Sequence, residues 1–336
     1  MKKQVGLTRM IKNFFVFFYL CSTILLATNI QPSHVFQADG SVTDIVHDDS
    51  KIFVSTNASA INIYNLKTKK LINTISVPQV KDFMGDLTDA KIYNLDIYKN
   101  KLLFTAQASK GYREVFLYEN KKLIKLISLD KMLLIGKSKF VNENQIIFST
   151  LGNEMYLYDF KKEKTIWKIN IKTQNDSFNS KFSDFAINET KDFVVVADES
   201  GDLKIVDIKK AKIVKYLEAR NLDNVFKVDF KNNKIITAGQ DGRCVFYDLG
   251  KNTDYYLKEK KWFLIYAAGL TPSGSKAAFS SDEENNVTVF DTKTKEKLFK
   301  LENNLMTLSS ILFINEDEIF VTTDSDTFNY YNLKGK

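Results

Sequence analysis

The chain contains a repeated strand ending, and this repeat constrains its fold more than any other feature. Seven apolar segments each finish on an acidic residue or an asparagine. They are INIYN, VFLYE, MYLYD, LKIVD, CVFYD, VTVFD and NYYN, which end at Asn65, Glu119, Asp159, Asp207, Asp248, Asp291 and Asn332. The intervals between these residues are 54, 40, 48, 41, 43 and 41. A period of this length, with several short strands in each unit, predicts the blades of a β-propeller.

Each unit carries signals for four strands. In Ile235–Asp248, IITAGQDGRCVFYD, two strands flank Asp241-Gly242, a dipeptide that suits a tight hairpin turn. After the repeated acidic residue comes a lysine-rich turn, such as DFKKEK or DTKTKE, and then a further strand, such as TIWKINI. We expect this last strand to be the outer edge of its blade, where lysines oppose sheet-to-sheet association.

The number of strands in each unit predicts seven blades in a closed ring. Six complete units span Ser41–Val77, Lys91–Leu129, Leu133–Ile171, Phe182–Ala219, Val225–Glu259 and Trp262–Glu302. The seventh, Met306–Asn332, has three strands, and His34–Ala38 precedes the first unit without belonging to it. This N-terminal segment can supply the missing strand and close the ring, which removes the last open edge. We therefore expect an all-β, seven-bladed propeller over residues 33–334.

The N-terminal 27 residues have the pattern of a secretory signal peptide. Lys2, Lys3, Arg9 and Lys12 precede the apolar run Phe14–Ala27, which is about 14 residues long and short for a membrane span of about 20. We expect cleavage after Ala27 and a periplasmic mature protein, with Met10 as an alternative start. An uncleaved anchor is the alternative; a lipoprotein cleaved at Cys21 is disfavoured because Leu20 replaces a small residue.

Composition argues against nucleic-acid binding and against an enzyme. The net charge of +7 falls to about +3 without the signal segment, which leaves 44 basic and 41 acidic residues. Two histidines, His34 and His47, cannot form a multi-histidine metal site, and no nucleophile triad or glycine-rich phosphate loop is present. We expect no catalytic residue, no metal and no cofactor. The acidic stretches at 47–49 and 198–202 are expected to be turns, and Cys244 a small buried side chain.

Two segments are candidates for contact with a partner protein. The connection Val77–Ile92 is unusually long, and insertions between blades project from one face of a propeller. We expect Phe83, Met84, Asp86 and Leu87 to offer partner contacts there. A second group is Tyr255, Tyr256 and Trp262 with Phe263, for which packing within the blades is the simpler alternative.

The strand endings resemble those of WD40 repeats, with Tyr, Phe or Val in place of Trp. The histidine of the WD40 hydrogen-bonded tetrad does not recur, so packing of apolar strands must contribute more. A quinoprotein-like or a lactonase-like propeller is an alternative to a regular WD40 propeller. Two tryptophans, Trp167 and Trp262, are too few for the tryptophan-docking repeats of quinoproteins.

With its N-terminal signal, DGRCVFYD and lysine turns, the whole chain resembles the NapL-type accessory propellers of periplasmic nitrate reductase systems. The resemblance implies an accessory role in maturation of, or electron delivery to, a periplasmic molybdenum reductase. Together with the signal peptide, the closed propeller and the missing catalytic set, it leads us to expect a periplasmic interaction protein, monomeric by itself, whose partners are nitrate reductase subunits or maturation factors. The membrane would be contacted only through an uncleaved signal segment. An envelope scaffold for outer-membrane assembly and a lactonase-like enzyme are the alternatives.

Overall fold

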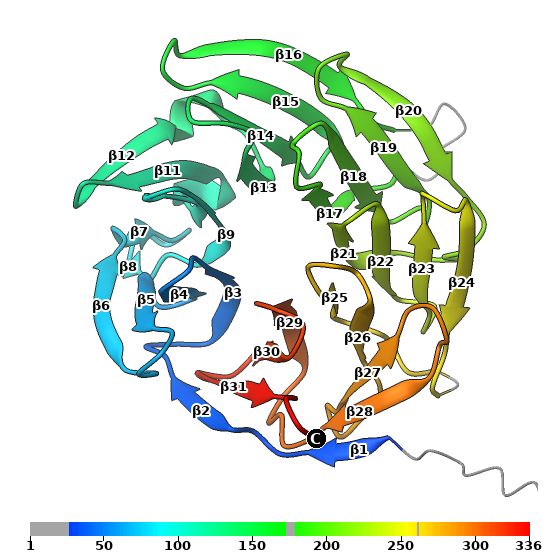
Figure 1. The fold of residues 1–336 in the computed structure, drawn as a ribbon. Coiled ribbons are helices and arrows are strands. Elements are labelled where there is room, and N and C mark those ends of the chain that lie inside the picture. The colour runs from blue at the N-terminus through cyan, green and yellow to red at the C-terminus, as the bar shows by residue number, and fades with distance from the viewer. Residues whose placement is uncertain (1–26, 173–178, 261) are drawn as a thin grey trace, which may run out of the picture.

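The computed structural model describes residues 27–172, 179–260 and 262–336, so the predicted signal peptide lies outside the described residues except for Ala27. Seven sheets, each built on antiparallel strands, surround a central axis, which confirms the predicted seven-bladed propeller (Figure 1). The described helical segments are two single 3-10 turns, η1 (Ser109–Gly111) and η2 (Leu129–Lys131). No helix in this part of the chain is long and apolar enough to cross a membrane.

The first four blades follow the predicted units. From the inner to the outer strand, the first blade is β3 (Val42–His47), β4 (Lys51–Thr56), β5 (Ala60–Asn65) and β6 (Leu71–Ser76), and the second is β9 (Ile92–Tyr98), β10 (Lys101–Gln107), β11 (Arg113–Glu119) and β12 (Lys122–Ile127). The third is β13 (Ile135–Phe140), β14 (Gln145–Thr150), β15 (Glu154–Asp159) and β16 (Lys164–Asn170), and the fourth is β17 (Phe182–Ile187), β18 (Phe193–Asp198), β19 (Leu203–Asp207) and β20 (Lys212–Leu217). A small hairpin, β7 (Val80–Lys81) and β8 (Leu87–Thr88), stands between the first two blades.

The last three blades complete the ring. The fifth is β21 (Val225–Lys231), β22 (Lys234–Gly239), β23 (Cys244–Asp248) and β24 (Thr253–Leu257), and the sixth is β25 (Ala268–Leu270), β26 (Lys276–Ser280), β27 (Val287–Asp291) and β28 (Lys297–Leu301). The seventh is β29 (Leu308–Phe313), β30 (Glu318–Thr323) and β31 (Thr327–Asn332) with β2 (His34–Gln37) as its outer strand.

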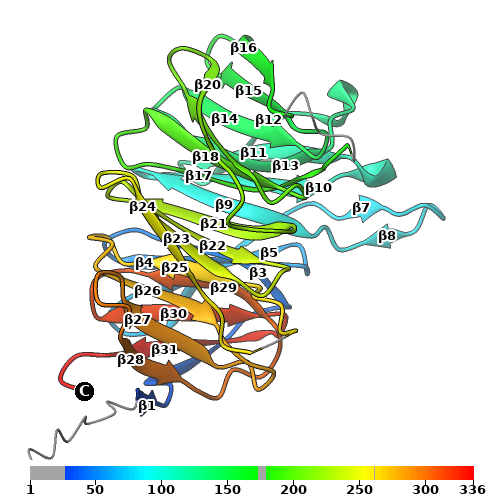
Figure 2. The same ribbon diagram turned by 90° about the vertical axis from the view of Figure 1, so that its right-hand side faces the viewer.

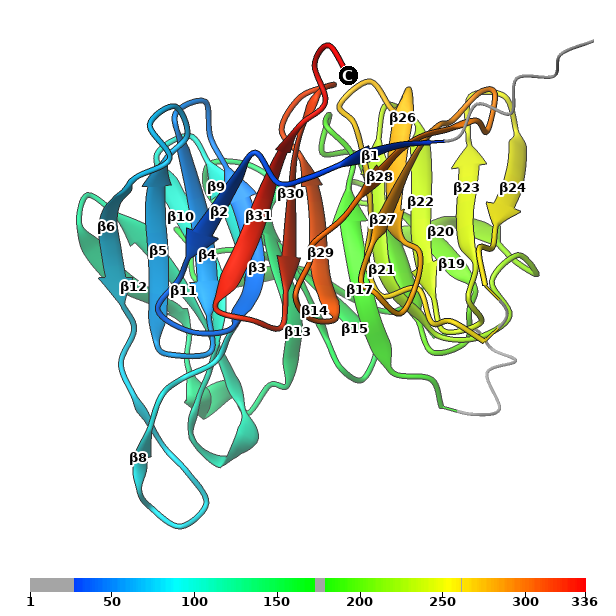
Figure 3. The ribbon, with the colours of Figure 1, turned by 90° about the horizontal axis from the view of Figure 1, so that it is seen from below.

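The N-terminal segment closes the ring, as predicted, and it also adds a strand to the neighbouring blade. Strand β2 pairs antiparallel with β31, so that Phe36 lies opposite Phe328. Strand β1 (Thr28–Ile30), which the sequence did not predict, adds in parallel to β28 at the outside of the sixth blade. The N-terminal segment thus crosses the outside of two neighbouring blades (Figure 3).

The repeated acidic or asparagine residue has a local structural role. In the third blade, the carboxylate of Asp159 accepts hydrogen bonds from the backbone N–H groups of Lys161 and Lys162 at 3.1 and 3.0 Å. In the first blade, the side-chain amide oxygen of Asn65 accepts hydrogen bonds from the backbone N–H groups of Lys67 and Thr68. The repeated residue therefore fixes the lysine-rich turn that leads to the outer strand.

Aspartates on the inner strands join neighbouring blades. Asp44, Asp96, Asp184 and Asp229 each accept a backbone N–H from the inner strand of the next blade, at 2.7–3.0 Å. The corresponding donors are Leu95, Phe140, Val228 and Leu270. Besides the apolar packing between blades, these carboxylate bonds tie the blades together in a chain that lacks the histidine tetrad.

Candidate protein-binding face

Because the four strands of a blade alternate in direction, each outer strand ends at the same end of the propeller at which the inner strand of the next blade begins. We call this end the connection face. The hairpin β7–β8 projects from it well beyond the blades, as Figures 2 and 3 show. The long interval in the sequence therefore corresponds to a structured projection from the ring.

The tip of the hairpin is held by one aspartate. The carboxylate of Asp82 accepts the backbone N–H groups of Met84 and Asp86 at 2.8 and 2.9 Å, and Gly85 takes a positive φ of 94° that favours glycine. This turn directs Phe83 outward, and its side chain is 100% exposed. Met84 and Leu87 are exposed as well, while Asp86 contributes its backbone to the turn.

The base of the hairpin is anchored to the ring. Gln79 donates to Asp89 across the two strands at 3.0 Å, and the buried backbone N–H of Ala90 donates to the Ser59 hydroxyl at 2.6 Å. A groove of about 380 Å³ runs between the hairpin and the second blade, where Phe116 forms part of its wall. The hairpin therefore presents its apolar tip from a fixed base.

The aromatic group on the fifth and sixth blades divides into different environments. Trp262 lies on the connection face, 84% exposed, with a positive φ of 74° that is unusual for a bulky residue. Tyr256 is on the outer strand β24, where the Arg243 guanidinium lies 4.4 Å from its ring centre. Tyr255 is partly buried, and its hydroxyl donates to the backbone carbonyl of Thr292 in the next blade at 2.7 Å. Tyr255 therefore packs between blades and is not part of the connection face.

The structure reveals further exposed apolar residues on the connection face that the sequence analysis missed. They come from three other connections and are Met132, Leu134, Leu222, Leu305 and Met306. The remaining large apolar side chains that are exposed in the described chain lie on outer strands, at the rim of the propeller. The opposite end of the ring carries the lysine-rich turns. Outside the rim strands, the exposed large apolar residues of the described chain therefore lie at one end of the propeller.

The acidic loop at 198–202 is a turn, as expected, and it holds an internal cation. The ammonium of Lys204 lies 2.6 Å from a carboxylate oxygen of Asp198 and 3.0 Å from the Ser200 hydroxyl. Both charged side chains are buried, and Asn153 donates to the same carboxylate. The ammonium group of Lys204 therefore occupies the position beside the Asp198 carboxylate that a bound metal ion would need.

The other candidate residues are structural. At 47–49, the Asp48 carboxylate accepts the backbone N–H groups of Ser50 and Lys51, which is a turn, and burial lowers the pKa of the adjacent His47. Cys244 is buried, as predicted, and burial raises the pKa of its thiol well above the usual value. Over the described ranges, no three His, Cys, Asp or Glu side chains form a group that could hold a metal ion.

Comparison with known proteins supports the fold. No protein-family model matches the chain, and no curated protein matches it in sequence. Among solved structures, it is similar to the Cps50 (Swd1) β-propeller domain of Myceliophteria thermophila, with a TM-score of 0.71 and 11% sequence identity over 90% of this chain and 99% of that one. At this identity the likeness shows a WD40-like propeller fold and nothing finer.

Proposed function

We propose that this protein is a non-catalytic interaction propeller that binds a protein partner through its connection face. The observation that carries the proposal is the hairpin tip, where Phe83 and Met84 stand exposed, away from the ring, on a base held by hydrogen bonds. Exposed aromatic and methionine side chains of this kind bind by entering an apolar pocket of the partner. The propeller supplies the scaffold on which this hairpin is held.

We further propose that the partner belongs to a periplasmic nitrate reductase system, either a reductase subunit or a maturation factor. Support comes from the resemblance of the whole chain to NapL-type accessory propellers and from the N-terminal signal pattern, which favours a periplasmic location. The role would be in maturation of the reductase or in electron delivery. An envelope scaffold is the second candidate, because exposed residues of the connection face also suit an outer-membrane assembly partner.

The test is capture of partners from the native periplasm by the tagged protein, with identification by mass spectrometry. Replacing Phe83 and Met84 together by serine is expected to reduce capture at least tenfold, since one hot-spot residue contributes about 2 kcal/mol or more to binding. A matched control replaces Leu71 and Ile72 by serine. These two adjacent residues are each 50% exposed, on the rim strand β6, and should leave capture unchanged.

The identity of the captured protein separates the candidates. Recovery of a nitrate reductase subunit or maturation factor, lost only in the hairpin variant, would support the accessory role. Recovery of outer-membrane assembly proteins would favour the envelope scaffold instead. Equal loss of capture in both double variants would contradict the assignment of binding to the connection face.

A further inference from the structure

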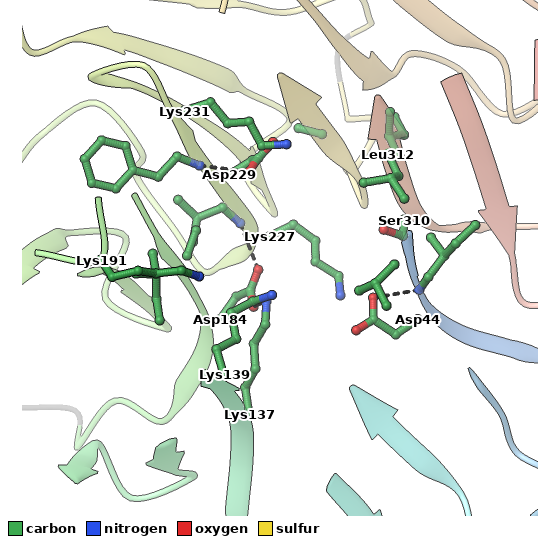
Figure 4. Close-up of a pocket in the computed structure, with 18 residues that line it drawn as sticks. Asp44, Lys137, Lys139, Asp184, Lys191, Lys227, Asp229, Lys231, Ser310 and Leu312 are labelled. Carbon is green, nitrogen blue, oxygen red and sulfur yellow. Dashed lines mark hydrogen bonds and ion pairs between the residues drawn. The ribbon is translucent and has the colours of Figure 1, made fainter. Parts of the chain in front are cut away.

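Lysines gather in the central channel, in a cavity that the proposed partner binding does not use. The cavity has a volume of about 210 Å³ and is lined by the inner strands β3, β13, β17, β21, β25 and β29. Its cationic residues are Lys137, Lys139, Lys191, Lys227 and Lys231, and its acidic ones are Asp44, Asp184 and Asp229 (Figure 4). A fourth carboxylate, Asp96, is paired with Lys139 at 3.1 Å. Positive charge therefore exceeds negative charge around this space.

The carboxylates of the channel are already engaged in the fold. One oxygen of Asp44 accepts the N–H of Ile45, and the other accepts the N–H of Leu95 in the next blade. Asp229 is likewise bonded to the backbone N–H groups of Phe230 and Leu270. These bonds hold the ring together, so the aspartates cannot turn toward the remaining lysines without breaking contacts between blades.

Two lysines are left without a carboxylate partner. Lys137 pairs with Asp184 at 2.6 Å, whereas Lys191 and Lys227 have no carboxylate within 4 Å in the described parts of the chain. Figure 4 shows the amines of Lys191 and Lys227 directed into the same space as those of Lys137 and Lys139. Lys227 comes from β21 and Lys191 from the turn after β17, so the ammonium groups converge from separate blades.

The lysines of the channel differ in their electrostatic environment: although burial acts to lower it, the neighbouring Asp96 carboxylate raises the pKa of Lys139. Burial lowers the pKa of Lys191 and of Lys137, which shows that the surroundings penalise their positive charge. An anion between these amines would offset that penalty, and a concave site with low-dielectric walls strengthens the attraction. A space of 210 Å³ corresponds to about seven water molecules at roughly 30 Å³ each, enough for a tetrahedral oxyanion with some of its water.

We propose that the central channel binds a small oxyanion that carries two or more negative charges, with inorganic phosphate as its simplest representative. Lys227 and Lys191 supply the uncommitted charges, and Lys137 and Lys139 border the site. This site lies toward the turns that follow the inner strands, where Lys191 and Lys231 are. It is therefore at the end opposite the connection face and is independent of the proposed partner hairpin.

The proposal is tested by titrating the purified protein with sodium phosphate in calorimetry, at constant ionic strength maintained with sodium chloride. We expect saturable binding of one phosphate per chain, and weakening of at least tenfold in Lys227→Gln and in Lys191→Gln. The matched control is Lys209→Gln, an exposed lysine of the turn between β19 and β20, which should bind phosphate as the unchanged protein does. Circular dichroism of each variant establishes that the ring is intact.

Two results would overturn the proposal. One is the absence of saturable phosphate binding by the unchanged protein. The other is phosphate affinity in folded Lys227→Gln and Lys191→Gln equal to that of Lys209→Gln. Binding of a short polyglutamate peptide without any phosphate binding would also count against it, since the channel would then receive an acidic protein segment. Because the hairpin residues are unchanged in these variants, partner capture remains a separate measurement.

Discussion

Removal of the N-terminal segment before residue 39 is expected to open the propeller and to make its unfolding less cooperative. The deletion exposes the edge of β31 and removes the antiparallel pairing of β2, together with the parallel addition of β1 to β28. A seventh blade with an exposed edge is also open to association with other chains. Denaturant unfolding followed by circular dichroism should show a lower midpoint and a broader transition, and size-exclusion chromatography should show aggregation.

A single substitution tests the same closure without shortening the chain. Phe36 is buried between the seventh and first blades, with its ring stacked on Phe328 at 4.6 Å and edge-on to Tyr64 at 5.2 Å. Phe36→Ala should reduce the free energy of unfolding by about 3–5 kcal/mol, the usual cost of emptying a core phenylalanine site. Its neighbour Val35 is 54% exposed on the same strand, so Val35→Ala should change the free energy of unfolding by less than about 0.5 kcal/mol. Equal stability of the two variants would mean that β2 does not close the ring.

The repeat made the fold predictable, because its information is distributed over the whole chain. Six blades repeat the same turn chemistry at an asparagine or an aspartate, and a seventh unit one strand short implied a role for His34–Ala38. Strand β1 escaped prediction because Thr28–Ile30 is too short to show an alternating pattern. Its pairing depends on where the chain passes the sixth blade, which is a property of the closed ring.

The exposed apolar residues of the connection face were partly predictable, because the spacing of the repeat also marks an insertion between blades. Phe83 and Met84 stood out because their insertion lengthened the interval between two blades. Met132 and Leu222 lie in short connections, where one apolar residue has no periodic context and resembles an ordinary core residue. Their exposure follows from the direction in which each connection leaves its blade, and the sequence carries no local signal for that direction.

The cluster of channel lysines has no signal in any single strand of the sequence. Lys137 and Lys139 alternate with small or apolar residues on β13, and Lys227 and Lys231 alternate around Asp229 on β21. Such alternation is typical of a strand with one face in water. On the innermost strand of a propeller, that polar face points to the central channel. Charges that are far apart in sequence are therefore concentrated only when the ring closes.

Breaking the buried ion pair in the fourth blade is expected to destabilise the protein as strongly as emptying a core site. Lys204 and Asp198 are 1% and 0% exposed, and Asp198 also accepts hydrogen bonds from Ser200 and Asn153. Lys204→Met leaves an uncompensated carboxylate in the interior, which should cost about 3–5 kcal/mol in the free energy of unfolding. The measurement is denaturant unfolding of the purified variant.

A double-mutant cycle shows whether this cost comes from the uncompensated charge of the Asp198 carboxylate. Asp198→Asn combined with Lys204→Met removes both charges and keeps an amide oxygen for the backbone N–H of Ser200. Because a buried pair is often replaceable at little cost, the double variant should recover most of the stability lost by Lys204→Met. Lys210→Met is the control: Lys210 is 63% exposed in its pair with Asp207, and this change should cost less than about 1 kcal/mol. Additive losses in the double variant would show instead that the two charges are not coupled, which would contradict an uncompensated carboxylate as the cause of the loss.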